Sequence, residues 1–197
     1  YYEQHLVIAR AIGDRRGEGA ALGNLGIAYH DLGEYHRAID CYEQYLAIAR
    51  AIGDRRGEGA ALGSLGIAYF SLGDAHRAID CYEQHLTIAR EIGDRRGEGN
   101  ALEALGIAYK NLDEPAKAQD YYEQARDIWQ ALGDVASAAR LSWNLGLLYE
   151  KQGDLARAVP LVEHAAAFMQ QIGHAVYAQQ YSDHLNEIRQ KLAAQGG

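Results

Sequence analysis

The chain has 197 residues, of which 48% are hydrophobic and 23% charged, a composition typical of soluble globular proteins. Its formal net charge of -8 argues against a general affinity for nucleic acid or acidic membranes, because both partners require clustered Lys and Arg. The sequence has no apolar run of about 18 residues, no secretory signal pattern and only two cysteines, Cys41 and Cys81, so we expect a cytoplasmic protein.

An internal repeat of 40 residues runs through the sequence. The pair Gly13-Asp14 recurs as Gly53-Asp54, Gly93-Asp94 and Gly133-Asp134, with an altered copy at Gly173-His174. The stretch GDRRGEG itself occurs three times, starting at residues 13, 53 and 93. A single active site does not need three copies of its loop, whereas a repeat array needs its turn in every unit.

Each repeat contains two segments with the apolar spacing of an amphipathic helix. In the first repeat the earlier segment carries Leu22, Leu25, Ala28, Tyr29 and Leu32 on one face, and the later one carries Ala38, Ile39, Tyr42, Leu46, Ile48 and Ala49. Asp14 is placed as a helix N-cap, and Gly53 is placed to end the second helix in the left-handed conformation. The pattern predicts an all-α chain of helical hairpins.

The predicted elements follow in chain order from this spacing. We expect a partial second helix over 1–12, four hairpins over 14–52, 54–92, 94–132 and 134–172, and a polar capping helix over 174–193, all in a single array over 1–197. The first predicted helix contains Gly17, Gly19, Gly23 and Gly26, which together weaken it by about 3 to 4 kcal/mol relative to Ala. Stacking against neighbours must offset this cost, and we expect Gly26 to permit close contact between helices.

These residues resemble a known family. The pattern Leu25-Gly26-x-x-Tyr29, followed by Ala38 and Tyr42, recurs in each later repeat and is similar to the tetratricopeptide repeat in its 40-residue form, as in the LGN/Pins scaffolds and bacterial multi-repeat regulators. The resemblance implies a right-handed α-solenoid whose first helices line a concave groove for peptide segments of partners, without catalysis. Unlike LGN-type repeats, this chain has Ile27, not Asn, after Leu-Gly, so LGN-type partner chemistry is not expected.

The sequence carries no recognised catalytic or cofactor-binding motif. The loop from Gly13 lacks the spacing and the Lys-Ser or Lys-Thr pair of a P-loop, and its glycines do not fit the dinucleotide pattern. Arg15 and Arg16 could hold an anion at the helix N-terminus, or could be solvated or paired with Glu18 and neighbouring acids. The histidines show no H-E-x-x-H or paired i, i+4 arrangement, and none lies beside a Cys with metal-ligand spacing. We therefore predict no enzyme, no metal and no cofactor.

An apolar residue out of phase with the core marks a candidate binding surface. Ile27 lies opposite the core face at 100 degrees per residue, and Ile67, Ile107 and Leu147 repeat it. The stripe either faces a partner or contacts the neighbouring first helix. Trp143 is the strongest single anchor candidate, with core packing as its alternative. The predicted partner-binding residues are Arg16, Asn24, Ile27, His30, Arg56, Ile67, Phe70, Arg96, Asn100, Glu103, Ile107, Lys110, Arg140, Trp143, Asn144 and Leu147.

The sequence thus favours a noncatalytic scaffold that binds a protein or peptide segment in its groove. Two alternatives stay open: an array that self-associates end to end into a homo-oligomer, and a sensor module of a larger regulator. No nucleic-acid or membrane partner is expected.

Overall fold

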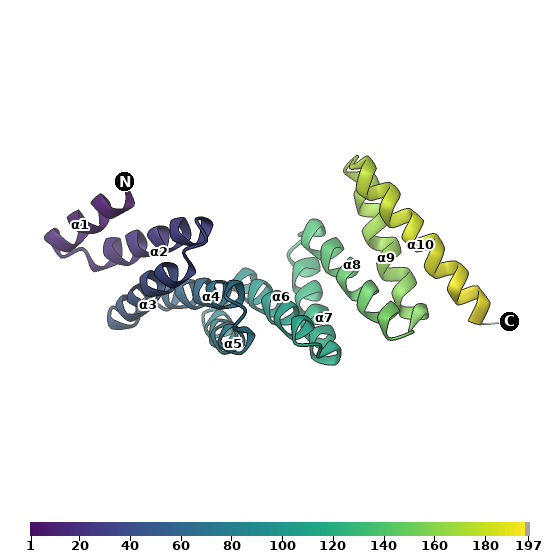
Figure 1. Ribbon diagram of the computed structural model, residues 1–197, viewed down its shortest axis with the longest axis horizontal. Helices are drawn as coiled ribbons and strands as arrows, with labels where there is room; N and C mark the ends of the chain where they lie inside the picture. Colours follow the sequence, from purple (N-terminus) through teal and green to yellow (C-terminus); the bar gives the residue numbers. More distant parts are fainter. Residues whose placement is uncertain (196–197) are drawn as a thin grey trace. The chain divides into compact units, whose positions relative to one another are not determined.

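The computed structural model describes residues 1–195, and this part of the chain is all-α, with ten helices and no strand (Figure 1). The helices are α1 (Tyr2–Ile12), α2 (Arg15–Asp31), α3 (Tyr35–Ala51), α4 (Arg55–Ser71), α5 (Ala75–Glu91), α6 (Arg95–Asn111), α7 (Pro115–Ala131), α8 (Val135–Lys151), α9 (Leu155–Gln171) and α10 (Ala175–Gln195). None of these helices combines the length and the apolar character that crossing a membrane requires.

The helices form two compact units. The first spans Tyr1–Asp113 and holds α1 to α6, and the second begins at Glu114 and holds α7 to α10. Within each unit every helix packs against the next one along the chain, and in the first unit α2 also contacts α4, and α4 contacts α6. The predicted fold class, an all-α solenoid of helical hairpins, is confirmed. The division into four hairpins within one array stays a prediction.

Aspartates start the first helix of each hairpin. The side chains of Asp14, Asp54 and Asp94 each accept a hydrogen bond from the backbone N–H three residues later, at 2.9 Å. Asp134 does the same with Ser137 at 3.1 Å. These are N-caps, which satisfy backbone donors that a helix leaves unpaired at its start.

Glycines end the second helices as the sequence predicts. Gly13, Gly53, Gly93, Gly133 and Gly173 all have a positive φ between 68° and 73°, a conformation that side chains with a Cβ disfavour. Asp113 is the one described residue other than glycine with a positive φ, at 56°, and it stands where the other hairpins have Gly33, Gly73 and Gly153. Asp tolerates this conformation better than most residues.

The hairpins close on glycines that allow two helices to approach. A Cβ added to Gly26 would lie 2.7 Å from Cδ1 of Tyr42, and one added to Gly66 would lie 2.6 Å from Cδ1 of Tyr82. In the second unit a Cβ on Gly146 would lie 2.6 Å from Cγ2 of Val162. The expected role of Gly26 in close contact is therefore confirmed.

One core prediction is wrong. Leu32 was placed on the core face of the first helix, but its side chain is 71% exposed. The residue is the C-cap of α2, and the chain turns away from the helix directly after it, at Gly33. Leu22, by contrast, lies in the middle of the helix and is buried as expected.

Candidate partner-binding surface

The exposed faces of α2, α4 and α6 form one candidate surface in the first unit. We call it the first-helix surface and define it by the repeat positions of Arg16, Ala20, Asn24, Ile27 and His30. Ile27, Ile67 and Ile107 occupy one position in three successive repeats and are 51%, 52% and 39% exposed. Large apolar side chains are thus presented at the same place on three neighbouring helices.

The other predicted residues of this surface differ in accessibility. Arg16, Arg56, Arg96, Asn24, Asn100 and Lys110 are exposed, and His30 and Phe70 are half-buried. His30 Nε2 lies 3.0 Å from the hydroxyl of Ser71, which joins α2 to α4 at this end of the surface. Glu103 is an exception, because only 7% of it is exposed. We therefore exclude Glu103 from the candidate surface.

The second unit places its predicted residues in a different setting. Arg140 on α8 is exposed, whereas Trp143, Asn144 and Leu147 are half-buried. The ring of Trp143 stacks on Tyr181 of α10, with centroids 3.7 Å apart and planes 4° apart. Trp143 therefore already has an aromatic partner within the unit, which agrees with the packing alternative for this side chain.

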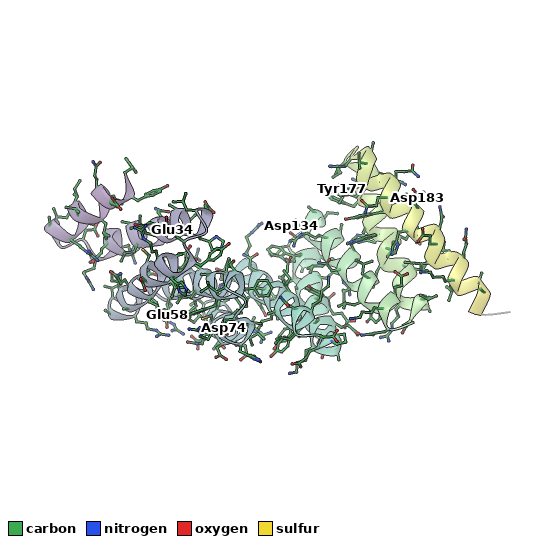
Figure 2. The ribbon with its side chains drawn as sticks, viewed as in Figure 1. Glu34, Glu58, Asp74, Asp134, Tyr177 and Asp183 are labelled. Atoms are coloured by element: carbon green, nitrogen blue, oxygen red, sulfur yellow. The ribbon has the colours of Figure 1, made fainter. Side chains whose placement is uncertain are left out.

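A pocket of about 620 Å³ opens beside this stack. It is lined by Trp143 and by six residues of α10: Val176, Gln179, Gln180, Asp183, His184 and Glu187. Figure 2 labels Tyr177 and Asp183 on α10. His184 lies 2.9 Å from Glu150 of α8, and Lys191 donates to the same carboxylate at 2.7 Å. Sequence reasoning missed Tyr181 and His184 as part of this site, because it treated α10 only as a cap.

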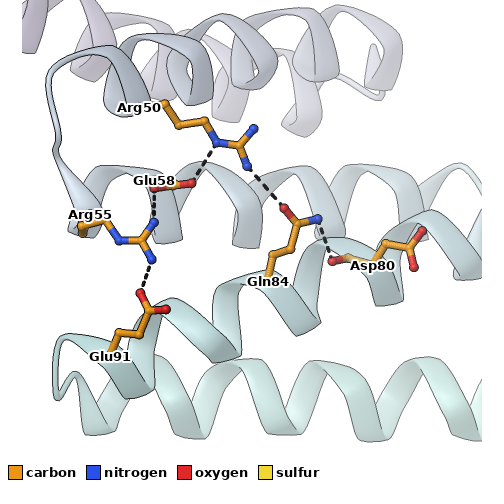
Figure 3. Close-up of polar contacts among 6 residues, drawn as sticks. All are labelled: Arg50, Arg55, Glu58, Asp80, Gln84 and Glu91. Carbon is orange, nitrogen blue, oxygen red and sulfur yellow. Dashed lines mark hydrogen bonds and ion pairs between the residues drawn. The ribbon is translucent and has the colours of Figure 1, made fainter.

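A cluster of ion pairs holds successive hairpins together and explains the first arginine of GDRRGEG. Arg50, at the end of α3, donates to Glu58 of α4 at 2.8 Å, and Arg55 donates to the other oxygen of the same carboxylate at 2.5 Å (Figure 3). Arg50 also donates to Gln84 of α5, and Arg55 pairs with Glu91. The Glu58 carboxylate thus joins α3 to α4, and its two arginine partners extend the network to α5.

The same cluster recurs in the other early repeats. Arg10 and Arg15 donate to Glu18 at 2.8 and 2.6 Å, and Arg90 and Arg95 donate to Glu98 at 2.9 and 2.5 Å. The alternative in which Arg15 pairs with Glu18 is therefore the correct one. At the matching positions of the fourth repeat stand Gln130, Val135 and Ala138, so all three members are replaced together.

The electrostatics of these carboxylates follow from their partners. Burial alone would raise the pKa of Glu58, but the hydrogen bonds from Arg50 and Arg55 outweigh it, and the pKa lies below its ordinary value. For Glu18 the hydrogen bond from Arg10 is the main cause of a lowered pKa. Glu18 and Glu58 therefore stay ionised at neutral pH and act as structural anions.

A second recurring network lies at the other end of the first helices. Arg37 stacks over the ring of Tyr29, 3.9 Å from its centroid, and donates to its hydroxyl at 2.6 Å. Arg77 and Arg157 lie over Tyr69 and Tyr149 in the same way, at 4.6 and 4.3 Å. In the first, second and fourth hairpins this face thus carries a cation–π contact within the hairpin, which stabilises the repeat.

No group of three or more His, Cys, Asp or Glu residues among residues 1–195 is arranged to hold a metal ion. Cys41 and Cys81 are both buried, and desolvation raises the pKa of Cys81 to about 11. A buried thiol with a raised pKa is a poor nucleophile.

Comparison with known proteins identifies the family of these hairpins. A family model described as the tetratricopeptide repeat matches residues 1–51, 57–131 and 97–171. The chain belongs to the tetratricopeptide-repeat family. Proteins with this repeat are in general noncatalytic and serve protein interaction. A comparison with curated protein sequences gave no significant match. The narrower likeness to LGN/Pins proteins stays a prediction.

Solved structures share this fold at low sequence identity. BtubC (BKLC) from P. vanneervenii is 23% identical with a TM-score of 0.77, over 100% of this chain and 90% of that one. A STAND protein with a tetratricopeptide repeat sensor, from Pyrococcus horikoshii, is 21% identical with a TM-score of 0.75, over 83% of this chain and 26% of that one. A Rap protein complexed with competence and sporulation factor is 20% identical with a TM-score of 0.69, over 99% of this chain and 59% of that one. At these identities the likeness concerns the fold alone.

Proposed function

We propose that the chain is a noncatalytic module that binds a segment of a partner protein across the first-helix surface. The supporting observation is the row of Ile27, Ile67 and Ile107, which are between 39% and 52% exposed on three neighbouring helices. Apolar side chains exposed at one position on neighbouring helices form a row that suits the apolar edge of a partner.

The row is large enough to contribute measurably to binding. Fully burying an isoleucine contributes about 1.5 to 3 kcal/mol, so the exposed halves of three contribute roughly 2 to 5 kcal/mol before the entropic costs of association. Leu147 lies at the matching position in the second unit, where it is half-buried, and it stays a proposed partner-binding residue of that unit.

Ile67→Asp tests the proposal, with Ile52→Asp as the matched control. Both isoleucines lie in the first unit and are 52% and 39% exposed, but Ile52 is the C-cap of α3 and lies off the first-helix surface. We expect Ile67→Asp to abolish capture of a partner by the immobilised chain, with little change in melting temperature, and Ile52→Asp to preserve capture. A large fall in the melting temperature of Ile67→Asp, with capture unchanged at temperatures where the variant is still folded, would show that the row belongs to the core.

A specific observation also favours self-association as a second candidate. The second-helix element α1 exposes Val7, Ile8 and Ile12, at 67%, 58% and 71%. A second copy of the chain could cover this face. Sedimentation velocity over a hundredfold range of concentration, on the order of 1 to 100 μM, tests this, because dimers of weak to moderate affinity dissociate within it. A sedimentation coefficient that matches the monomer and does not change with concentration would remove this candidate.

A sensor role within a larger regulator is the third possibility, and it is compatible with the first. The Pyrococcus horikoshii STAND protein carries a tetratricopeptide repeat sensor as part of a longer chain. In that case partner binding at the first-helix surface would be the sensed event, and the Ile67→Asp variant would remain the relevant test.

A further inference from the structure

The first-helix surface carries a second row of residues parallel to the isoleucines. Arg16, Arg56 and Arg96 are exposed and precede Ile27, Ile67 and Ile107 by 11 residues each. Two residues that are 11 positions apart lie on nearly the same side of a helix, because about 100 degrees per residue leaves them within roughly 20 degrees of each other around the axis. At about 1.5 Å per residue, the Cα atoms of the two rows lie roughly 16 Å apart along α2, α4 and α6.

The strip between the two rows is lined by small residues. Ala20, Ala60 and Asn100 occupy one exposed position, and Asn24 and Ser64 the next exposed or half-buried one. Gly23 and Gly63 lie alongside, and the rings that fill the space near them, Tyr45 and His85, come from the adjacent second helices. The strip therefore has a low floor bordered by arginines on one side and isoleucines on the other.

We propose that an amphipathic α-helix with one acidic edge and one apolar edge occupies this strip. The inference rests on the proposed function. An α-helix with its side chains is about 10 to 12 Å across, so it can touch the isoleucines while its other edge meets the extended guanidinium groups. An extended strand is only about 5 Å wide and would reach one row at a time. The width of the strip thus favours a helical partner.

The charge of the surface specifies the acidic edge. At the positions that define it, the exposed charged residues are four cations, Arg16, Arg56, Arg96 and Lys110, in a chain whose net charge is -8, and the anion Asp31 lies next to this surface at the end of α2. Cations are thus concentrated on this face of an otherwise acidic protein. Arg16 lies 3.7 Å from Asp54, but the Arg16 side chain is 80% exposed and Asp54 also accepts the N–H of Gly57. Because the arginine end of this pair lies in solvent and the separation is long, we expect the pair to contribute only about 1 kcal/mol, so a partner carboxylate can compete for the guanidinium.

Two peptide-display libraries selected against the immobilised full chain test the inference. One library presents randomised surface positions on a helical scaffold, and the other presents unstructured peptides of equal length. We expect the helical library to give the stronger binders, enriched in Asp and Glu along one edge and in Leu, Ile or Phe along the other. Selection of basic helices, or of extended peptides over helical ones, would overturn the inference and leave the proposed function standing.

Variants of the chain then locate the selected helix. We expect Arg56→Glu to weaken binding about tenfold, a difference of about 1.4 kcal/mol, and the charge-preserving Arg56→Lys to change it by less than about twofold. Ile67→Asp should abolish binding. Loss with Ile67→Asp but no effect of Arg56→Glu would remove the acidic edge from the inference. The absence of any binder from both libraries, or binders indifferent to Ile67→Asp, would count against the proposed function itself.

Discussion

Two glycines one turn apart in α2 should respond to the same substitution in opposite ways. A Cβ on Gly23 would lie 3.4 Å from Cδ1 of Tyr45, close to an ordinary carbon–carbon contact. A Cβ on Gly26 would lie 2.7 Å from Cδ1 of Tyr42 and closer still to its Cε1. Tyr42 is only 3% exposed, so its ring has little room to move. Gly23→Ala should therefore stabilise the chain and Gly26→Ala should destabilise it.

The magnitudes follow from two opposing terms. Alanine in place of glycine inside a helix stabilises by about 0.8 to 1 kcal/mol, and this term is the same at both positions. Overpacking of a filled interface costs about 1 to 3 kcal/mol, and it applies only at Gly26. The propensity terms cancel in the comparison, so the two variants should differ in their free energies of unfolding by about 1 to 3 kcal/mol.

Urea denaturation followed by circular dichroism measures this difference directly. We expect the unfolding midpoint of Gly23→Ala to lie at or above that of the unchanged chain and the midpoint of Gly26→Ala to lie below it. Equal midpoints for the two variants would show that Tyr42 can move aside, and the explanation of Gly26 as a close-contact residue would fail.

Two further predictions concern ionisable groups. Glu58→Gln should lower the free energy of unfolding by about 1 kcal/mol at pH 7, because Arg50 and Arg55 lose their anion but remain half-exposed. The effect of Glu58→Gln should shrink below about pH 4. The pKa of Glu58 is lowered in the folded chain, so its contribution to stability is present above the pKa of the unfolded chain and is lost as pH falls through the pKa of the folded chain. An equal effect at pH 3 and pH 7 in urea titrations would contradict this prediction. Burial lowers the pKa of His85, so stability should fall as pH drops below about 6.5, where the unfolded chain gains the proton first. His85→Tyr, which copies Tyr45 of the preceding repeat, should remove the fall in stability between about pH 6.5 and 5. Melting temperatures measured across this range test the prediction, and a melting temperature of the variant that still falls with pH as in the unchanged chain would contradict it.

The parts of the fold that depend on local chemistry were predictable from the sequence. Gly13 and Gly53 end helices because only glycine adopts their positive φ without strain, and Asp14 begins the next helix because its side chain reaches a free N–H. Both signals act within a few residues, and the 40-residue period repeats them. The opposite placement of Ile27 and Leu22 also follows from helix geometry alone.

The parts that depend on neighbouring helices were not predictable in the same way. Periodicity assigned Leu32 to the core face, but it could not show that the helix ends there and that no neighbouring helix buries the side chain. Trp143 stands at a surface position of its helix, yet Tyr181, 38 residues later, covers one of its faces. A signal for the Arg10–Glu18 pair was present, since both residues recur at a fixed separation and are lost together later.

Two neighbouring arginines in GDRRGEG serve different surfaces because they differ by about 100 degrees around the helix. Arg15 turns to Glu18 at the junction between hairpins, while Arg16 remains 80% exposed on the first-helix surface. Both are kept in three repeats and both are absent from the fourth, where Val135 and Ala136 stand. The junction cluster and the arginine row therefore end at the same repeat, and the proposed recognition of an acidic helix is confined to the first unit, over residues 1–113.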